Sequence, residues 1–522
     1  MLWNAHVNAS IAFVFSSGGA IALQICFLVF LVFATFAIFF SPSPTAPAKA
    51  TRYTPLRLIF VTAFVAILIY QMLWQIYGYT KPEFMKFLRR YNRRSNAADI
   101  QTQRGPIFDR NGLVLAAPVA TDVWGRRYPF GASVVHPLGY FHSRYGITGV
   151  ERIFDPRLSG YDMNFEKTSF QDWKEMLLTP QAKEGKPVRL TLDIRLQQRA
   201  YEVMGGRKGA VVVLVPSTGE ILALVSSPGF DPFYPEVALR DEEAKPAFNR
   251  AAQGLYPPGS TFKLVVAALA LDRGMEPKFN CPAGGYIAGP HTPAIRDSEY
   301  YAYKRAGAVW PGWGDMSMTD AVVHSSNVYF AQLGVKLGTE PFNELGIKTQ
   351  IRKPLVYLQG ESGALRTSAG NLPEVEYRRV LAQLCIGQGR LLVTPLHVAC
   401  YTAALANQGL MMQPQLDADA PHEPMSRLCT VRSANRVKGF MAQVVTRGTG
   451  KTLGLPELEV CGKTGTAQVP RAPDHAWFTC FAPRTAPKVA VTVLVENGGF
   501  GAKSAMPVAR EVLLECRKLG YL

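Results

Sequence analysis

The residues best suited to chemistry in this sequence are a serine and a lysine three positions apart, Ser260 and Lys263. Tyr256 to Gly259 holds two prolines and a glycine that stop any earlier element, and a long Ala- and Leu-rich run follows through Leu271. This pattern predicts a helix starting near Ser260, apolar on nearly every face and therefore in the middle of a domain. The two side chains would share the first turn, where unpaired N–H groups and the positive dipole end suit a nucleophile and its base.

Two later motifs decide whether this pair is more than a serine cap followed by a solvated lysine. Ser325 to Asn327 interrupts a helical pattern, as a loop between two short helices does, and can present a hydroxyl and an amide to a cleft. Lys463 to Thr466 reads K-T-G-T in a predicted strand, where the glycine lets a backbone or a ligand approach closely. Each is weak alone: Ser433 to Asn435 also matches S-x-N, and an ordinary strand can carry one exposed lysine. In order, S-x-x-K, S-x-N and K-T-G are far more specific than any one of them.

The elements around the motifs predict an α+β domain. Helical patterns dominate from Ser260 to about Gly450, and a last helix is expected from about Pro507 to Leu519. Five segments have strand patterns, two before the helical region and three after it: 209–215, 220–225, 458–468, 476–481 and 488–495. The first is a continuous apolar run, typical of a sheet covered on both faces. We therefore expect one antiparallel sheet of five strands, flanked by helices and assembled from both ends of the domain.

The composition indicates a membrane anchor: 48% of the residues are hydrophobic and only 18% are charged. Two charge-free runs, about 11–40 and 58–78, are long enough to span a bilayer as helices. Lys49, Arg52 and Arg57 between the runs favour a cytoplasmic loop, whereas the basic residues after the second run favour the opposite orientation. Charge alone therefore does not fix the topology.

The net charge of +17 is not accompanied by any basic and aromatic nucleic-acid motif, so basic residues beside a span are better matched to anionic lipid. Seven cysteines lie outside the membrane runs, an odd number that cannot pair completely within the chain. None forms C-x-x-C, which argues against a zinc or thioredoxin-like site. Most have apolar neighbours, so buried free thiols are expected.

From about Arg104 to the C-terminus the sequence resembles the penicillin-binding proteins, specifically the class B monofunctional transpeptidases. The three ordered motifs are joined by nine further segments typical of that family: Arg104–Gly112, Gly149–Glu151, Thr191–Asp193, Pro216–Glu220, Ile386–Gly389, Thr394–Leu396, Gly448–Gly450, His475–Phe478 and Glu496–Gly499. The resemblance implies the fold shared by penicillin-binding proteins and serine β-lactamases, and D,D-transpeptidase activity on peptidoglycan.

By this resemblance, Ser260 attacks the carbonyl between the last two D-alanines of a stem peptide and expels D-Ala, leaving an acyl-enzyme. Lys263, kept partly neutral by burial and by the nearby Lys463, is the expected acceptor of the Ser260 proton. Ser325 would relay that proton to the leaving amine, and Asn327 would hold Lys263 and the substrate amide. An amine from a neighbouring stem peptide would then close the cross-link.

The same resemblance counts Lys463 as the fifth catalytic residue and assigns substrate binding to Thr464, Gly465 and Thr466. Lys463 and the hydroxyls of Thr464 and Thr466 would receive the terminal carboxylate. The N–H groups of Ser260 and Thr466 are the expected oxyanion hole. No metal, nucleotide or other cofactor is expected. His475 is expected to be structural, because the family uses a lysine base.

The expected organisation is a membrane anchor at 1–80, a juxtamembrane segment and a pedestal or dimerisation-like domain at 81–185, and the transpeptidase domain at 186–522. The residues before Arg104 leave no space for a glycosyltransferase domain, so a polytopic membrane glycosyltransferase is the expected partner. Cross-linking requires the catalytic domain on the outer, periplasmic side of the bacterial cytoplasmic membrane. The motifs also fit a carboxypeptidase or β-lactamase, and a non-catalytic β-lactam sensor or scaffold, so both alternatives stay open.

Overall fold

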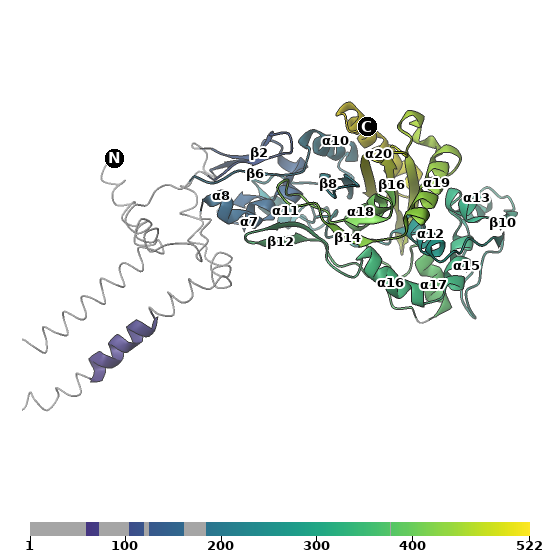
Figure 1. Cartoon of the computed structure of the whole chain (residues 1–522), viewed down its shortest axis with the longest axis horizontal. Coiled ribbons are helices and arrows are strands. Elements are labelled where there is room, and N and C mark those ends of the chain that lie inside the picture. The colour runs from purple at the N-terminus through teal and green to yellow at the C-terminus, as the bar shows by residue number, and fades with distance from the viewer. Residues whose placement is uncertain (1–58, 72–103, 120–124, 143, 161–183, 376) are drawn as a thin grey trace, which may run out of the picture. The chain divides into compact units, whose positions relative to one another are not determined.

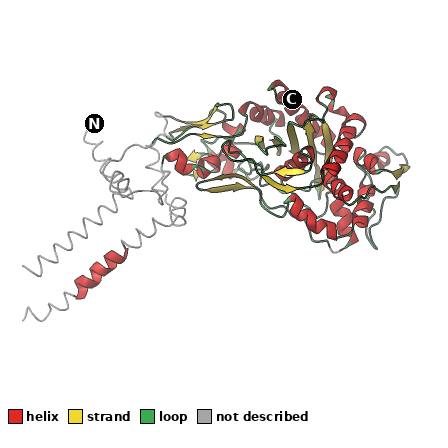
Figure 2. Cartoon of the chain, viewed as in Figure 1, coloured by secondary structure: helices red, strands yellow, loops and turns green. Residues whose placement is uncertain are grey.

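The computed structural model describes residues 59–71, 104–119, 125–142, 144–160, 184–375 and 377–522 (Figure 1). The chain divides into two compact units, and the larger one consists of Pro106–Ala117, Arg126–Asp155 and Pro187–Leu522. It contains every residue that the sequence assigns to the site. Its helices and strands are interleaved around one central sheet (Figure 2).

The smaller unit includes a helix at residues 59–71, inside the second predicted span. Its large apolar side chains are exposed, among them Ile59 at 64% and Phe60 at 69%. Within the described ranges, no helix is both long and apolar enough to cross a bilayer. The predicted span at 11–40 and the remainder of 58–78 lie outside the described residues.

A five-stranded antiparallel sheet forms the centre of the larger unit, as predicted. Its strand order is β15-β16-β17-β7-β8, so the three late strands pair with the early hairpin through β17 and β7. The inner strands β7 and β17 are buried along their whole length, which explains their continuous apolar sequences. The strands are β7 (Gly209–Leu214), β8 (Ile221–Ser227), β15 (Cys461–Val469), β16 (Ala472–Ala482) and β17 (Val489–Val495).

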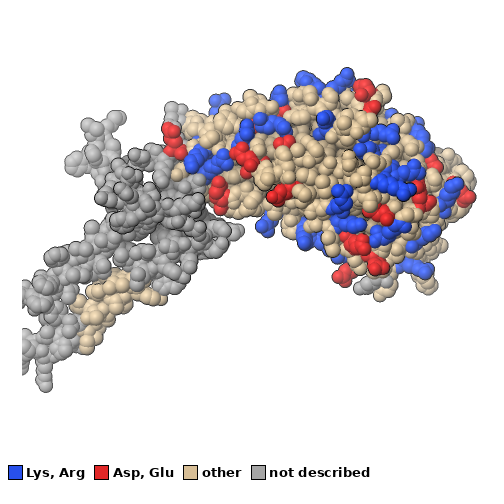
Figure 3. Space-filling view, in the orientation of Figure 1, with Lys and Arg blue, Asp and Glu red and all other residues tan. Residues whose placement is uncertain are grey.

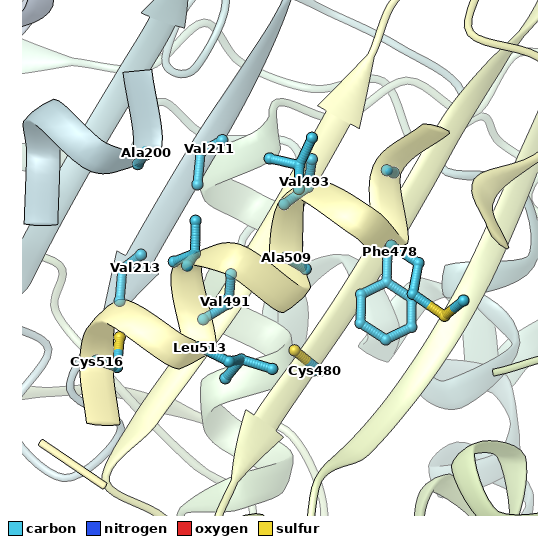
Figure 4. Packing of buried hydrophobic residues seen from close by; sticks show 14 of the residues in the cluster. Ala200, Val211, Val213, Phe478, Cys480, Val491, Val493, Ala509, Leu513 and Cys516 are labelled. Atoms are coloured by element: carbon cyan, nitrogen blue, oxygen red, sulfur yellow. The ribbon is translucent and has the colours of Figure 1, made fainter. Parts of the chain in front are cut away.

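Two helices, α10 (Ile194–Met204) and α20 (Gly501–Lys518), cover one face of this sheet. Figure 4 shows strand residues such as Val213, Val491 and Phe478 in one cluster with Ala509 and Leu513 of α20. This apolar interface stabilises the packing of the two helices on the sheet, because burial of apolar side chains is the dominant favourable term in folding. The cysteines here, Cys480 and Cys516, are buried free thiols, as are the other five in the described part of the chain.

The opposite face of the sheet is covered by α18 (Pro395–Ala406), which is buried over its entire length. A chain of hydroxyls crosses this interface: Thr402 lies 2.7 Å from Thr479, and Thr479 lies 2.7 Å from Thr492. Each buried hydroxyl therefore has a partner, which removes the cost of placing it in an apolar layer.

The last helix begins at Gly501, earlier than the predicted start near Pro507, which lies inside α20. The predicted start was too late because proline is favoured in the first turn of a helix, so the pattern pointed to Pro507. Packing fixes the true start, because a Cβ at Gly501 would lie 2.2 Å from the Trp477 carbonyl oxygen and 2.4 Å from that of Gly465. Only glycine lets the helix begin so close to β15 and β16.

Helices fill most of the region between β8 and β15, as predicted, with three small two-stranded sheets that the sequence did not indicate. The helices are α11 (Pro235–Arg240), α12 (Lys263–Asp272), α13 (Ser298–Arg305), α14 (Met318–Val323), α15 (Asn327–Leu337), α16 (Glu340–Thr349), α17 (Arg378–Cys385), α18 and α19 (Val431–Arg447). These sheets pair β9 (Phe279–Pro282) with β10 (Gly312–Met316), β11 (Val356–Gly360) with β12 (Gly363–Arg366), and β13 (Leu410–Met412) with β14 (Pro424–Arg427). The short 3-10 turns are η3 (Gly259–Thr261), η4 (Lys451–Leu453) and η5 (Pro456–Leu458).

The N-terminal part of the larger unit contains short elements held by buried polar groups. Arg126 and Glu151 form an ion pair of 2.6 Å with both side chains fully buried, and the Tyr128 hydroxyl donates to the same carboxylate at 3.2 Å. Asp109 accepts from the backbone N–H groups of Asn111 and Leu113, both at 2.8 Å, which closes the predicted turn. The elements are β1 (Ile107–Phe108), β2 (Val114–Pro118), β3 (Arg126–Arg127), η2 (Gly131–Ser133), α6 (Val135–Leu138), β4 (Phe141–His142), β5 (Gly146–Ile147), α7 (Gly149–Ile153) and β6 (Val188–Arg189). The helix α8 (Asp155–Ser159) belongs to the smaller unit except for its first residue.

Basic and acidic side chains are interspersed over the visible face of the larger unit (Figure 3). That face shows no continuous basic stripe of the kind that a nucleic-acid backbone requires.

Candidate active site

Ser260 lies in the 3-10 turn η3, and the α-helix α12 begins three residues later, at Lys263. A helical turn therefore begins near Ser260, as predicted, but it is a 3-10 turn, and the α-helix starts later than predicted. From Lys263 to Ala270 every residue of α12 is buried, so the predicted central position of this helix is confirmed. Ser260 itself is partly exposed, and its hydroxyl has no hydrogen-bond partner within the described ranges.

Close backbone contacts hold the serine turn between two neighbours. The Gly259 N–H donates to the Gly387 carbonyl at 2.9 Å, and a Cβ at Gly259 would lie 2.6 Å from the Thr466 carbonyl oxygen. The motif Ile386–Gly389 and the K-T-G strand β15 therefore both pack against the turn that carries Ser260. This contact brings Ser260 to the edge of β15.

Gly387→Ala is expected to destabilise the protein by about 3 kcal/mol and to slow acylation by penicillin. Gly387 has φ +73°, and a Cβ there would lie 1.9 Å from the Gly259 carbonyl oxygen, so alanine must displace the serine turn. Gly389→Ala is the matched control, since φ is +75° but the nearest atom to its Cβ would be 3.4 Å away. Thermal melting and acylation kinetics check both variants; equal effects of the two substitutions would contradict this account.

Ser325 and Ser326 form the predicted loop between two short helices, α14 and α15, and Asn327 is the first residue of α15. Ser325 has φ 62°, a conformation that non-glycine residues seldom adopt and that costs about 1–3 kcal/mol. Ser326 is the N-cap, and its side chain accepts from the Tyr329 N–H. The strained backbone turns the Ser325 hydroxyl and the Asn327 amide toward the lysines.

Lys263 donates hydrogen bonds to this loop. Its Nζ lies 2.6 Å from the Ser325 carbonyl oxygen, 2.7 Å from Asn327 Oδ1 and 3.4 Å from Ser325 Oγ. The ring of Phe330 lies 5.8 Å from the same nitrogen. Lys263 is fully buried, so these partners replace the water that an exposed ammonium group would have.

Lys463 approaches the loop from β15. Its Nζ donates to Ser325 Oγ at 2.8 Å and to the Thr464 carbonyl oxygen at 3.1 Å. The Ser325 hydroxyl is therefore shared by two fully buried lysines. The structure thus brings together Lys263, Ser325, Asn327 and Lys463, four of the five residues to which the sequence assigns catalysis, while Ser260 is joined to them through the packing of its turn on β15.

Burial dominates the electrostatics of the two lysines. It lowers the pKa of Lys263 to about 7, although the carboxylates of Asp297 and Glu299 oppose the shift. Burial and then the positive charge of Lys263 lower the pKa of Lys463 well below its usual range. A lysine with a pKa near neutrality can accept a proton at physiological pH, which an ordinary exposed lysine cannot.

The expected substrate-binding residues Thr464, Gly465 and Thr466 follow Lys463 along β15. The Thr464 hydroxyl lies 2.7 Å from that of Thr449, which follows α19. Thr449 belongs to the segment Gly448–Gly450, which is one of the segments typical of the family. In the structure it lies beside the K-T-G strand. Thr449 therefore adds a hydroxyl beside the two, of Thr464 and Thr466, that the sequence analysis assigned to the terminal carboxylate.

A buried network ties the segment before Ser260 to the far ends of β16 and β17. Tyr256 donates to Glu496 at 2.6 Å and Arg250 donates to the same oxygen at 2.9 Å. Trp477 Nε1 donates to the Pro257 carbonyl at 3.0 Å. These bonds give a role to Trp477 and Glu496, whose motifs are distant from the serine in sequence: they hold the chain that leads into its turn.

His475 has a structural environment, as expected. Its Nδ1 accepts from the Asn497 N–H at 3.0 Å, and its ring packs edge-on against Tyr256 with centroids 5.4 Å apart. Burial lowers the pKa of His475, which favours the neutral ring that accepts this bond.

The acidic residue Asp297 was missed by the sequence reasoning. It is buried and accepts hydrogen bonds from Ser326 and from the first backbone N–H groups of α15. An Asp just before Ser298 and Glu299 is a helix-start signal in the sequence. Nothing local indicates that its carboxylate reaches a motif some thirty positions later.

Comparison with known proteins agrees with this geometry. Residues 209–514 match the penicillin-binding protein transpeptidase domain. The chain belongs to this family. It is 34% identical to the peptidoglycan D,D-transpeptidase PbpA of Mycobacterium tuberculosis over 81% of this chain and 90% of that protein. It is 31% identical to the peptidoglycan D,D-transpeptidase MrdA of Haemophilus influenzae, over 78% of this chain and 71% of that protein.

Among solved structures, a ceftriaxone acyl-enzyme complex of penicillin-binding protein A from M. tuberculosis superposes with a TM-score of 0.69. The two sequences are 31% identical, and the match covers 80% of this chain and 99% of the other. The predicted class B penicillin-binding protein family and its transpeptidase fold are thus confirmed.

Proposed function

We propose that this penicillin-binding protein is a peptidoglycan D,D-transpeptidase that cross-links stem peptides through a serine acyl-enzyme and is inhibited by β-lactams. The observation that carries the proposal is the hydrogen-bonded cluster of Lys263, Ser325, Asn327 and Lys463 beside the Ser260 turn. Relatives named as D,D-transpeptidases, and a similar structure solved as a β-lactam acyl-enzyme, support the same chemistry.

In the proposed acylation, the Ser260 oxygen bonds to the carbonyl carbon between the two terminal D-alanines. Neutral Lys263 accepts the Ser260 proton, and its burial supplies the required pKa. The N–H groups of Ser260 and Thr466 stabilise the oxyanion. When the C–N bond breaks, Ser325 passes a proton to the leaving amine, and D-Ala departs.

Recognition of the donor peptide is assigned to β15. The terminal carboxylate of the peptide is bound by Lys463 and by the hydroxyls of Thr464 and Thr466, beside Thr449. Asn327 contacts the substrate amide while it holds Lys263. The acceptor amine then attacks the acyl-enzyme, and its proton returns through the same groups.

The decisive experiment gives the purified full chain a stem peptide ending in D-Ala-D-Ala, with and without an amine acceptor, and follows both D-Ala release and cross-linked product. A transpeptidase forms product in proportion to acceptor and keeps a penicillin adduct for many minutes. Rapid release of penicillin with free acid as the product would establish the hydrolase instead. Binding of penicillin without any D-Ala release would establish a sensor or scaffold.

For location, we propose anchorage in the cytoplasmic membrane with the catalytic unit outside. Two observations support it: the charge-free runs in the sequence, and a helix at 59–71 whose apolar side chains are exposed. A membrane-impermeant fluorescent penicillin added to intact cells, after permeabilisation of any outer membrane, is expected to label the protein fully. Labelling only after the cytoplasmic membrane is opened would place the catalytic unit inside.

The proposed partner is a polytopic membrane glycosyltransferase that supplies the polymerised strands. Cross-linking acts on strands that another activity must first polymerise from lipid-linked precursor. Co-purification from membranes after mild crosslinking tests this, with a polymerase assay on the recovered complex. Recovery of polymerase activity in the purified chain alone would remove the need for the partner.

A further inference from the structure

We propose that Asp297 is a positioning residue for acyl transfer: its carboxylate fixes the loop Ser325–Asn327, so that this loop can hold Lys263. The inference rests on the proposed function of the same site. It assigns a task to a residue outside the three motifs, which lies just before α13.

Asp297 is 2% exposed, and every hydrogen bond described for its carboxylate comes from the S-x-N loop or the first turn of α15. Ser326 Oγ donates to both carboxylate oxygens at 3.1 Å. The backbone N–H of Asn327 donates to Oδ1, and that of Val328 does so at 3.1 Å. A single carboxylate thus satisfies the N-cap hydroxyl and two N–H groups that the helix leaves unpaired.

The same segment also fixes the Asn327 side chain. Its Nδ2 donates to the Arg296 carbonyl at 2.9 Å, which orients Oδ1 toward Lys263 at 2.7 Å. Arg296 and Asp297 therefore restrain both the backbone and the amide plane of Asn327. Because the amide cannot rotate without losing this bond, the acceptor for Lys263 is held in place before substrate binds.

Holding this loop is costly without such a restraint, because Ser325 has the uncommon φ of 62°. Strained residues of this kind persist only where their surroundings over-determine them. The hydrogen bonds to Asp297 begin at the next residue, Ser326, and continue for three positions. They are the restraint that the Ser325 conformation requires.

The charge of Asp297 has a second consequence for Lys263. The charged groups that act on Lys263 are Asp297 and Glu299, and the charge of Lys263 in turn lowers the pKa of Lys463 on β15. Both carboxylates raise the pKa of Lys263 against the larger effect of burial. Removing one negative charge lowers that pKa further, so neutral Lys263 persists to lower pH.

The test compares three variants of the full chain by the second-order rate of acylation with fluorescent penicillin, measured across a range of pH centred near the Lys263 pKa of about 7. Asp297→Asn keeps acceptor and shape but removes the charge, and Asp297→Ala removes both. Asp272→Asn is the matched control, because Asp272 accepts from the N–H and hydroxyl of Thr430 at the start of α19, at the opposite end of α12 from Lys263. Thermal melting of each variant reports folding.

For Asp297→Asn we expect the plateau rate to fall by about tenfold, the scale of one charge-assisted hydrogen bond, and the acid limb to move to lower pH. Asp297→Ala should fall by about a hundredfold. Asp272→Asn should keep the wild-type rate and profile even if its melting temperature drops. A well-folded Asp297→Asn with the wild-type plateau and profile overturns the proposal, whereas failure of the proposed function would appear as a wild type that neither releases D-Ala nor forms cross-linked product.

A second comparison separates position from charge. Glu299 also raises the pKa of Lys263, but its described side-chain hydrogen bond is to Ser298, outside the S-x-N loop. Glu299→Gln should therefore shift the acid limb to lower pH without a tenfold loss of plateau rate. Equal plateau losses in Glu299→Gln and Asp297→Asn would show that charge alone is responsible and would refute the positioning role.

Discussion

Ser260→Ala is expected to abolish covalent labelling by penicillin, a loss of about a millionfold in acylation that takes the rate to background. The reason is chemical rather than structural, because the Ser260 oxygen forms the covalent bond and no neighbour replaces it. The Ser325 hydroxyl accepts hydrogen bonds from both lysines. In the proposed mechanism it passes a proton to the leaving amine and does not attack the carbonyl carbon. D-Ala release from a stem peptide should disappear in parallel.

The measurement is stoichiometry of adduct by intact-protein mass, with thermal melting to show that the variant is folded. Ser217→Ala, in the exposed turn between β7 and β8, serves as the control and should label like the wild type. Adduct at wild-type stoichiometry in Ser260→Ala would assign the nucleophile elsewhere. Complementation of a deletion strain by Ser260→Ala would favour the scaffold alternative.

The sequence predicted the sheet and the site for the same reason: both depend on patterns that are local. Continuous apolar runs identified the inner strands β7 and β17, and the ordered motifs identified Lys263, Ser325 and Lys463. Each motif places reactive or hydrogen-bonding side chains within a few consecutive residues, so it can be recognised without the fold. Their meeting in space was predicted from the resemblance, and the hydrogen bonds among them confirm it.

What the sequence could not predict depends on contacts between distant segments. Asp297 acts on residues some thirty positions later, and an aspartate before a helix is common. Gly387 is required by the carbonyl of Gly259, which no local pattern shows. The start of α20 was misplaced because the demand for a small residue at Gly501 comes from β15 and β16, not from the helix. Tertiary packing thus decided the cases in which propensity failed.

The pKa of Lys263 provides the second large expected effect, in the pH dependence of acylation. The proposed base must be neutral, and burial lowers its pKa to about 7. Below that pH the ammonium form predominates, so the acylation rate should fall about tenfold per pH unit, and above it the rate should reach a plateau. A base with an ordinary lysine pKa would instead keep the rate rising through alkaline pH.

Lys263→Met should therefore lower the plateau rate by about 10³ to 10⁴ and also remove this limb, because methionine fills a similar volume without a titrating group. Lys438→Met is the control: burial also lowers the pKa of Lys438, but its Nζ donates to Ala406 on α18, away from the site. The wild-type limb should persist in that variant. If Lys263→Met retained both the rate and the limb, the base would be Lys463, the other buried lysine on the Ser325 hydroxyl, and Lys463→Met would then be the variant that loses them. Since Ser325 contacts both amines, only the paired substitutions distinguish a lysine that takes the proton from one that binds the carboxylate.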